Sequence, residues 1–393
     1  MARSTAQVGI VGAGPAGLML SHLLHLYGIS SIVLEARSRD YCEARVRAGV
    51  LEHTTVQMLR EAGVAERLNR EGLLHEGIEI GIQGRRRRIP FVELTGKAVT
   101  VYGQQEVVKD LIARRLADGG DIRFECGEVS LKSFVDGSPL IYFAKAEEEN
   151  SIACDFIAGC DGSHGVSRPF IPEGSLTLYE RIYPFAWLGI LAEAAPSRDE
   201  LLYMQSSRGF ALYSMRSPRI TRLYLQCRPD EDLAEWSDDR IWDELQARLG
   251  CGDGWKPAEG PILQKSITGM RSFVVEPLQC GRLFLAGDAA HVVPPTGAKG
   301  MNLAFADVHY LAEALRAKYQ DNDESKLEAY SATCLRRIWN AQRFSAWMTS
   351  LLHRFEEASG FDCRRQQAEL EYLMSSRAAA TSLAENYVGL PLE

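Results

Sequence analysis

The chain has 393 residues, and 44 Lys and Arg against 52 Asp and Glu give it a formal charge of −8. Hydrophobic residues make up 46% and charged residues 24%, which is typical of a globular protein of about two or three structural units rather than a disordered chain. The acidic balance argues against a nucleic-acid or membrane partner, because those surfaces require an excess of Lys and Arg. The nine Cys show no metal-site spacing, so we expect reduced thiols in the cytoplasm and no bound metal.

The first elements along the chain are a strand, a helix and a second strand. Residues 8–11 are an apolar run, apolar residues recur at helical spacing from 16 to 27, and 32–35 form a second strand-like run. Residues 4–34 carry no Asp, Glu, Lys or Arg, but Gly and Pro interrupt them, so neither a signal peptide nor a membrane helix is expected. We interpret the segment as a βαβ unit with two adjacent parallel strands.

The remaining elements follow from periodicity and turn residues. The pattern predicts, in order, a helix over 54–69, a strand–turn–strand over 78–92, a helix over 106–116, a hairpin over 140–153 with its tip at 147–150, and a buried strand over 156–159. The four arginines at 85–88 are expected to form a solvated turn. Residues 183–228 alternate with period two, which predicts an antiparallel sheet with one polar face. After it, the pattern predicts a helix over 238–249 capped by Ser237, a buried strand over 282–286, and mainly helix after residue 295.

A GxGxxG motif lies between the first strand and the first helix. Gly12 permits the tight turn, Gly14 lets the backbone approach a pyrophosphate, and Gly17 allows the helix to pack closely on the strand. Glu35 ends the next strand 35 − 17 = 18 residues after Gly17, which is typical of a ribose-binding carboxylate. The sequence therefore predicts a dinucleotide at the positive end of this helix.

Two later strands also end in an acidic residue beside glycine. They read Phe-Ile-Ala-Gly-Cys-Asp-Gly over 156–162 and Leu-Phe-Leu-Ala-Gly-Asp over 283–288. Because ligands of open α/β sheets bind at the carboxyl ends of the strands, we expect Asp161 and Asp288 there, with Asp288 accepting a ribityl or ribose hydroxyl. This succession of GxGxxG, Asp-Gly and Gly-Asp resembles the FAD-dependent aromatic hydroxylases, the group A flavoprotein monooxygenases.

The resemblance runs along essentially the whole chain, and it includes the segments 45–52, 203–216, 294–302 and 385–391. It implies an α/β fold with a GxGxxG-type FAD-binding domain built on a parallel sheet, an inserted antiparallel-sheet substrate domain and a helical C-terminal region. The implied boundaries are 1–180 for the first part of the FAD-binding domain, 181–270 for the substrate sheet, 271–300 for the last strand of the FAD-binding domain and 301–393 for the helical interface region. A cytoplasmic homodimer without a nucleic-acid or membrane partner is also implied.

The substrate segments look like those of family members that act on 4-hydroxybenzoate. The resemblance then implies that O2 and NADPH are used to form 3,4-dihydroxybenzoate through a C4a-hydroperoxide of FAD. A guanidinium suits the substrate carboxylate, and a hydrogen bond to the phenol, whose pKa is ordinarily ~10, favours the reactive phenolate. The implied substrate-binding residues are Ser214, Arg216, Tyr224 and Thr296. The implied catalytic residues are Tyr203 at the phenol, its relay partners Tyr387 and His75, and Pro295, whose backbone faces the phenol oxygen.

Two cofactor sites are implied. The expected FAD contacts are Gly12, Gly14, Gly17, Glu35, Arg45, Arg47, Gln104, Asp161, Arg222, Asp288, Lys299 and Asn302. Because the chain has a single GxGxxG, the nicotinamide cofactor is expected in a surface groove, where Arg37 and Arg39 would bind a 2′-phosphate and favour NADPH over NADH. The expected NADPH contacts are Arg37, Tyr41, Arg45, His164, Arg168 and Arg271. Arg222 and Tyr224 would also hold the flavin as it moves between a buried and an exposed position.

Three alternatives stay open. The first is the same chemistry on 4-aminobenzoate or 3,4-dihydroxybenzoate, because Ala186, Tyr213 and Met215, expected near the pocket, differ from those of the best-known members. The second is another flavoenzyme, a reductase or a halogenase, although we find no lysine relay of the kind that a halogenase needs. The third is a binding protein that keeps the nucleotide fold without redox activity, which would purify without a tightly bound yellow flavin.

Overall fold

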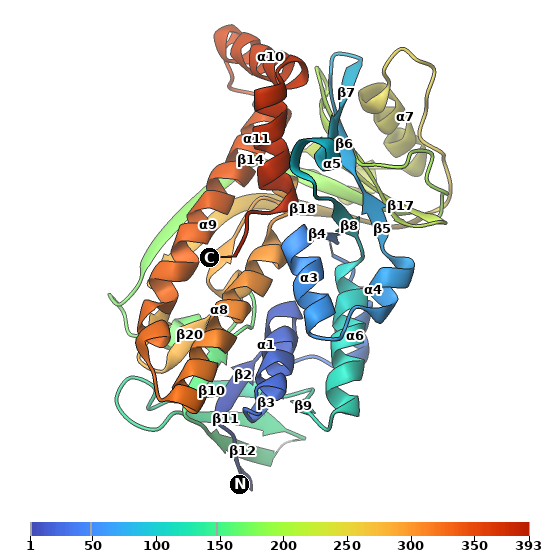
Figure 1. Ribbon diagram of the computed structural model, residues 1–393. Coiled ribbons are helices and arrows are strands. Elements are labelled where there is room, and N and C mark those ends of the chain that lie inside the picture. The colour runs from blue at the N-terminus through green and yellow to red at the C-terminus, as the bar shows by residue number, and fades with distance from the viewer. Residues whose placement is uncertain (1, 48, 147, 393) are drawn as a thin grey trace.

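The computed structural model describes residues 2–47, 49–146 and 148–392 (Figure 1). Within them, a six-stranded sheet carries the predicted βαβ unit, in which α1 (Pro15–Leu26) connects two adjacent parallel strands. The strand order is β19 (Gln279–Cys280), β20 (Leu283–Leu285), β13 (Phe156–Gly159), β2 (Val8–Val11), β3 (Ser31–Leu34) and β9 (Asp121–Arg123). All neighbours are parallel except β19 and β20. The carboxyl ends of β20, β13, β2 and β3 therefore meet at one edge.

Helices and a second sheet cover this parallel sheet. The helix α1 packs against α6 (Gln104–Ala117) and α8 (Gly300–Asp321), and their apolar residues share one core with the strands (Figure 1). The second sheet has the order β1 (Ala2–Thr5), β12 (Glu148–Ala153), β11 (Leu140–Lys145) and β10 (Gly127–Lys132). It packs closely, because a Cβ atom on Gly9 would overlap the side chain of Ile141.

The predicted antiparallel sheet is the centre of an eight-stranded sheet. Its order is β21 (His291–Val292), β18 (Ile262–Glu276), β14 (Thr177–Ala192), β17 (Ile220–Cys227), β16 (Gly209–Ser217), β15 (Leu202–Ser206), β6 (Gly77–Ile82) and β7 (Arg85–Pro90). One face packs against α7 (Asp238–Leu249), whose N-cap is Ser237 as predicted. The other face packs against C-terminal helices and the sheet β4 (Val50–Leu51), β8 (Val99–Val101), β5 (Leu73–His75).

Strand alternation separates two groups of residues that were expected near the substrate pocket. Ala186, Tyr213 and Met215 lie in the core that the sheet forms with α7. Phe210 and Leu212, the alternating neighbours of Tyr213 on β16, lie in the core on the opposite face. Since successive side chains of a strand point to opposite faces, Tyr213 and Met215 face away from the side of the sheet that carries Ser214 and Arg216.

The helical region after residue 295 was predicted correctly. It consists of α8, α9 (Ser325–Leu352), α10 (Gly360–Ser375) and α11 (Arg377–Val388), with α8 and α9 side by side and α10 at one end of the molecule (Figure 1). Shorter helices are α2 (Arg39–Ala44), α3 (His53–Glu61), α4 (Glu66–Glu71) and α5 (Phe91–Thr95). In the described chain, no helix has both the length and the apolarity that crossing a membrane would require. Nor do the described residues include a group of ligands able to hold a metal ion.

Three local predictions were wrong. The helix expected over 54–69 is two helices, α3 and α4, because Gly63 adopts a left-handed φ of 71° after α3 and ends it. The hairpin tip expected at 147–150 is shorter, since Glu148 already pairs with Lys145, while Glu147 is outside the described residues. The arginines at 85–88 form the edge strand β7 instead of a turn, and acidic side chains on neighbouring elements stabilise three of them there.

Candidate active site

The GxGxxG turn has the geometry that a dinucleotide requires. Gly12 has a φ of 106°, and a Cβ atom there would overlap the carbonyl of Cys160. A Cβ on Gly17 would overlap the carbonyl of Gly12, so the helix could not pack as closely. By contrast, a Cβ on Gly14 would meet no protein atom within 4 Å. Gly14 is the N-cap of α1 and provides no side-chain cap, which leaves the first N–H groups of the helix for a phosphate.

Acidic side chains lie around this turn as the strand ends predict. Glu35 accepts hydrogen bonds from the N–H groups of Ala13 at 2.8 Å and Arg37 at 2.9 Å, which fixes its carboxylate beside the glycine turn. Asp161 accepts one from the N–H of Ser167 at 2.7 Å, and its other oxygen is buried without a partner. Burial raises the pKa of Asp161. An unpartnered buried oxygen at this edge suits a hydroxyl donor of a bound cofactor.

A group of charged residues faces the same edge. Burial and the adjacent Arg45 lower the pKa of Arg47, whereas Asp288 and Tyr41 raise it, so these four side chains share one electrostatic environment. Asp288 itself is exposed. Gln104 is the first residue of α6, where the chain leaves β8. These donors and acceptors, together with the uncapped helix, fit an anionic dinucleotide such as FAD.

Asn302 and Lys299 at the start of α8 are engaged within the protein. The Asn302 amide donates to the carbonyls of Val50 at 3.0 Å and Ala298 at 2.8 Å, and it accepts from the N–H of Glu52 at 2.9 Å. Lys299 is buried and pairs with the Glu52 carboxylate at 2.6 Å. Burial lowers the pKa of Lys299, and Glu52 opposes this shift. Both side chains therefore tie α8 to the segment around β4.

Arg216, Arg222 and Tyr224 form a cluster on β16 and β17, in which Arg222 is buried and the other two are partly buried. Arg216 donates to the Ser214 hydroxyl at 3.3 Å and to the Met215 carbonyl at 3.0 Å, while its Nε atom is buried without a partner. One Nη atom of Arg222 is also buried and unpartnered. Burial raises the pKa of Tyr224, but the guanidinium groups of Arg216 and Arg222 have the opposite and larger effect. The pKa of Tyr224 is therefore below its usual value. Two guanidinium groups, each with one buried and unpartnered nitrogen, fit an anionic ligand.

The hydroxyls of Tyr203 on β15 and Tyr387 on α11 are 2.6 Å apart. Both rings are buried, and burial raises the pKa of each hydroxyl, so each stays protonated. His75 on β5 is buried too, and neither of its ring nitrogens has a partner in the described chain. Burial lowers its pKa to about 4, against the opposing charges of Glu200 and Asp199. The structure thus pairs the two tyrosines directly but records no hydrogen bond from either of them to His75.

The loop between β21 and α8 lies against α9. Thr296 is buried, and its hydroxyl is 3.0 Å from that of Thr349. A Cβ on Gly297 would come within 2.8 Å of the Ser345 hydroxyl, so the loop rests directly on the helix. Pro295, which precedes Thr296, is exposed.

The expected NADPH contacts form two groups. Arg168 and Arg271 both lie over the ring of Phe273, at 4.7 and 5.6 Å from its centroid. His164 is exposed in the same loop as Ser163, whose carbonyl accepts a hydrogen bond from Arg168 at 3.0 Å. The second group is Arg37 and Tyr41, with the guanidinium of the former 5.5 Å from the ring centroid of the latter.

Sequence reasoning missed a buried pair beneath the Gly-Asp turn. Asp307 on α8 accepts a hydrogen bond from the Gly287 N–H at 2.9 Å, and the same oxygen is 2.6 Å from Nε2 of His291. Burial lowers the pKa of His291, but Asp307, with a smaller contribution from Asp288, outweighs this and raises the pKa above its usual value. The sequence signal that could have indicated this pair is Asp307 itself. It lies among the buried residues of α8, and a buried carboxylate requires a partner. Glu52, Arg337 and His353 are further ionisable groups with partners inside the protein that the sequence did not single out.

Comparison with known proteins identifies the family of this chain. The FAD-binding domain family matches residues 5–345. The chain is 50% identical to p-hydroxybenzoate hydroxylase from Acinetobacter baylyi over 98% of this chain and 96% of that one. It is 26% identical to rifampicin monooxygenase from Streptomyces venezuelae over 82% of this chain and 67% of that protein. The crystal structure of p-nitrophenol 4-monooxygenase from Pseudomonas putida DLL-E4 has the same fold, with a TM-score of 0.83 and 18% identity over 99% of both chains. The chain is an FAD-dependent aromatic monooxygenase and belongs to the family of p-hydroxybenzoate hydroxylase.

Proposed function

We propose that the enzyme hydroxylates 4-hydroxybenzoate to 3,4-dihydroxybenzoate with NADPH as the reductant and O2 as the oxidant. The observation that carries this proposal is the pair of buried features on one side of the eight-stranded sheet. These are a guanidinium with an unpartnered N–H group at Arg216, and the hydroxyl pair of Tyr203 and Tyr387. An anion site and a phenol site match the two ends of this substrate. The relative with 50% identity, named p-hydroxybenzoate hydroxylase, supports the same assignment.

Arg216 is the proposed partner of the substrate carboxylate. Ser214 accepts from its Nη1 atom at 3.3 Å and so holds the guanidinium in place, while the Nε atom stays available for the ligand. Tyr224 lies close enough to both Arg216 and Arg222 for their charges to lower its pKa. We propose that Tyr224 and the buried Thr296 complete the walls of the substrate site. In a buried site, the desolvation of the guanidinium makes its pairing with a carboxylate selective.

Tyr203 is proposed to hydrogen-bond the phenol oxygen. Because burial keeps its own pKa high, Tyr203 remains a donor and can stabilise the substrate phenolate without losing its proton. Its oxygen can simultaneously accept from Tyr387, and such a chain of hydroxyls strengthens each bond. His75 is held neutral by its lowered pKa, and it is proposed to pass the proton on, accepting it at one unpartnered nitrogen while the other nitrogen releases one. The exposed Pro295 is proposed to present its backbone to the phenol oxygen.

FAD supplies the redox chemistry when it is bound. We propose that Gly12, Gly14 and Gly17 make room for its diphosphate at the start of α1, and that Glu35 accepts from its ribose. The proposed partners around the rest of the cofactor are Arg45, Arg47, Gln104, Asp161, Arg222, Asp288, Lys299 and Asn302. For Lys299 and Asn302 the proposed effect is electrostatic and through the backbone, because their side chains are engaged with Glu52, Val50 and Ala298.

NADPH is proposed to bind at the surface beside Arg168, Arg271 and His164, and to reach Arg37 and Tyr41 with its 2′-phosphate end. The two stacked arginines suit a diphosphate, and Arg37 is exposed next to the glycine-rich unit. Arg45 would contact this cofactor as well as FAD. Family membership is the basis on which we also propose a cytoplasmic homodimer.

The deciding experiment measures NADPH oxidation by the purified yellow protein in air, with and without 4-hydroxybenzoate. We expect oxidation to accelerate with the substrate and to yield 3,4-dihydroxybenzoate, identified by mass spectrometry. Faster turnover of 4-aminobenzoate or 3,4-dihydroxybenzoate would reassign the substrate. Purification without a flavin, or NADPH consumption that never yields a hydroxylated product, would contradict the proposal.

A further inference from the structure

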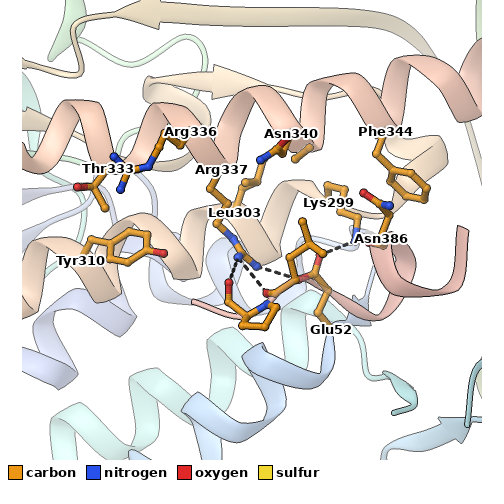
Figure 2. Close-up of a pocket in the computed structure, with 13 residues that line it drawn as sticks. Glu52, Lys299, Leu303, Tyr310, Thr333, Arg336, Arg337, Asn340, Phe344 and Asn386 are labelled. Carbon is orange, nitrogen blue, oxygen red and sulfur yellow. Dashed lines mark hydrogen bonds and ion pairs between the residues drawn. The ribbon is translucent and has the colours of Figure 1, made fainter. Parts of the chain in front are cut away.

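The chain crosses the Glu52 carboxylate immediately after α11. Gly389 has a φ of 97°, and a Cβ atom there would overlap the carboxylate, so this position accommodates glycine alone without rearrangement. The next residues, Leu390 and Pro391, line a pocket with Glu52 and with residues of α8 and α9 (Figure 2). The segment 389–391 thus lies between α11 and the charged residues at the start of α8.

Arg337 on α9 holds this segment. Its Nη1 atom donates to the carbonyls of Leu390 and Pro391, each at 3.0 Å, and its Nη2 atom pairs with Glu52 at 3.3 Å (Figure 2). The Arg337 side chain is 15% exposed and that of Glu52 is 5% exposed, so water screens this pair little. A planar guanidinium can bridge two carbonyls and a carboxylate at fixed angles, which an ammonium group cannot reproduce.

Lys299 extends the same arrangement to α11. Its Nζ atom pairs with Glu52 and donates to the Asn386 carbonyl (Figure 2). The same atom donates to the Tyr387 carbonyl at 3.2 Å. The last carbonyls of a helix have no hydrogen-bond donor within the helix, and Lys299 supplies that donor for two of them. Glu52 therefore joins two cations that together bind the carbonyls of residues 386, 387, 390 and 391.

Tyr387 is in the last turn of α11, between the bound carbonyls and the hydroxyl of Tyr203. Its ring stacks on Phe91 with centroids 5.0 Å apart, and its hydroxyl must stay 2.6 Å from Tyr203. We propose that Arg337 and Gly389 are positioning residues for the Tyr387 hydroxyl in the ionisation of the bound phenol. This inference rests on the proposed function of Tyr203 and Tyr387. A displacement of about 1 Å in a reacting group can cost about 100-fold in rate, so a loosened segment should be measurable.

The test uses the FAD-bound enzyme and the ultraviolet absorbance of bound 4-hydroxybenzoate as a function of pH. In Arg337→Gln and in Gly389→Ala we expect the apparent pKa of the bound phenol to rise by about one unit, with about tenfold slower hydroxylation. FAD content and substrate affinity should stay within about threefold. Arg337→Lys should recover only part of the loss, because an ammonium cannot bridge the same acceptors. Arg377→Gln is the matched control, since Arg377 begins the same helix but is 73% exposed and pairs with Glu93.

The decisive measurement combines these changes with Tyr387→Phe. If Arg337 acts through the Tyr387 hydroxyl, Arg337→Gln should have no further effect on the phenol ionisation in the Tyr387→Phe enzyme. An undiminished effect there, or wild-type ionisation in Arg337→Gln, would overturn the inference. Should Gly389→Ala fail to fold, the Arg337 variants alone carry the test. A wild-type enzyme that neither ionises nor hydroxylates 4-hydroxybenzoate would instead refute the proposed function.

Discussion

At the scale of single residues, the informative side chains are buried polar groups whose donors are not satisfied. Arg216 has such a donor at Nε, and its neighbours Ser214 and Met215 satisfy only Nη1. An unsatisfied charged group in a core costs stability, so its retention indicates that a ligand completes it. The same argument applies to the free Nη atom of Arg222.

Arg216→Lys should weaken the binding of 4-hydroxybenzoate about 100-fold, because lysine keeps the charge but loses the forked donor geometry. Fluorescence titration of the FAD-bound enzyme gives the dissociation constant. Arg228→Lys is the control, since Arg228 follows β17, is 62% exposed and pairs with Asp230. Equal affinity in Arg216→Lys and the wild type would remove Arg216 from the substrate site.

Arg37 and Arg39 were expected to bind the 2′-phosphate together, but their contacts differ. Arg39 pairs with Glu43 at 2.6 Å, whereas the guanidinium of Arg37 lies over the ring of Tyr41. We therefore expect Arg37→Ala to lower kcat/KM for NADPH about tenfold and to leave that for NADH unchanged, because only NADPH carries the 2′-phosphate. Arg39→Ala should change the ratio much less. A constant NADPH/NADH ratio in Arg37→Ala would exclude it as the selecting residue.

At the scale of elements, the glycines of the turn between β2 and α1 are required for two different reasons, packing and ligand binding. Gly12 and Gly17 are constrained by contacts within the protein, whereas a Cβ atom at Gly14 would meet only open space. Gly14 has a φ of −74° and a ψ of 179°, which any residue adopts without strain. Glycine at this position is therefore explained by a ligand and not by the fold.

Gly14→Ala should leave the stability of the FAD-free protein within about 0.5 kcal/mol of the wild type and weaken FAD binding at least about tenfold. Thermal unfolding of the apoprotein and flavin fluorescence during reconstitution measure the two effects. Gly360→Ala, at the start of α10, also adds a Cβ that meets no atom within 4 Å and should change neither property. Unchanged FAD affinity in Gly14→Ala would place the diphosphate elsewhere.

At the scale of the whole molecule, the central strands of the eight-stranded sheet are buried on both faces, and a histidine lies in one of the resulting cores. The Nδ1 atom of His353 donates to the Thr349 carbonyl at 2.9 Å, and its Nε2 atom accepts from the Trp187 indole at 2.6 Å. The imidazole also stacks on Phe185, with centroids 4.5 Å apart. Burial lowers its pKa to about 3, so the folded protein holds this ring neutral.

This histidine makes stability depend on pH below neutrality. The unfolded chain binds a proton near pH 6.5, but folded His353 does not until about pH 3, so stability falls as the pH drops through this window. The expected slope from this one group is about 1.4 kcal/mol per pH unit. In urea unfolding, His353→Gln should show a smaller stability difference between pH 8 and pH 5 than the wild type. His164→Gln, at an exposed site, should not, and an equal difference in His353→Gln would contradict the prediction.

The sequence alone determined those features of this protein that depend on interactions between residues close together in the chain. Gly12, Gly14 and Gly17 specify a turn through steric limits within a few residues, and Glu35 and Asp288 follow strands whose ends must meet in a parallel sheet. The period-two pattern similarly predicted the central antiparallel strands, but both faces of those strands are buried. Alternation therefore could not show that Tyr213 and Met215 face α7, on the side of the sheet opposite to Ser214 and Arg216.

Only the tertiary structure decided which distant groups meet. Glu52 joins Lys299 and Arg337 across about 250 to 285 positions of sequence, and Tyr203 meets Tyr387 across 184. The hydrophobic pattern of a sequence does not reveal such pairs. A charged or hydroxyl group within a helix or strand gives the same sequence pattern whether solvent or a buried partner satisfies its hydrogen bonds.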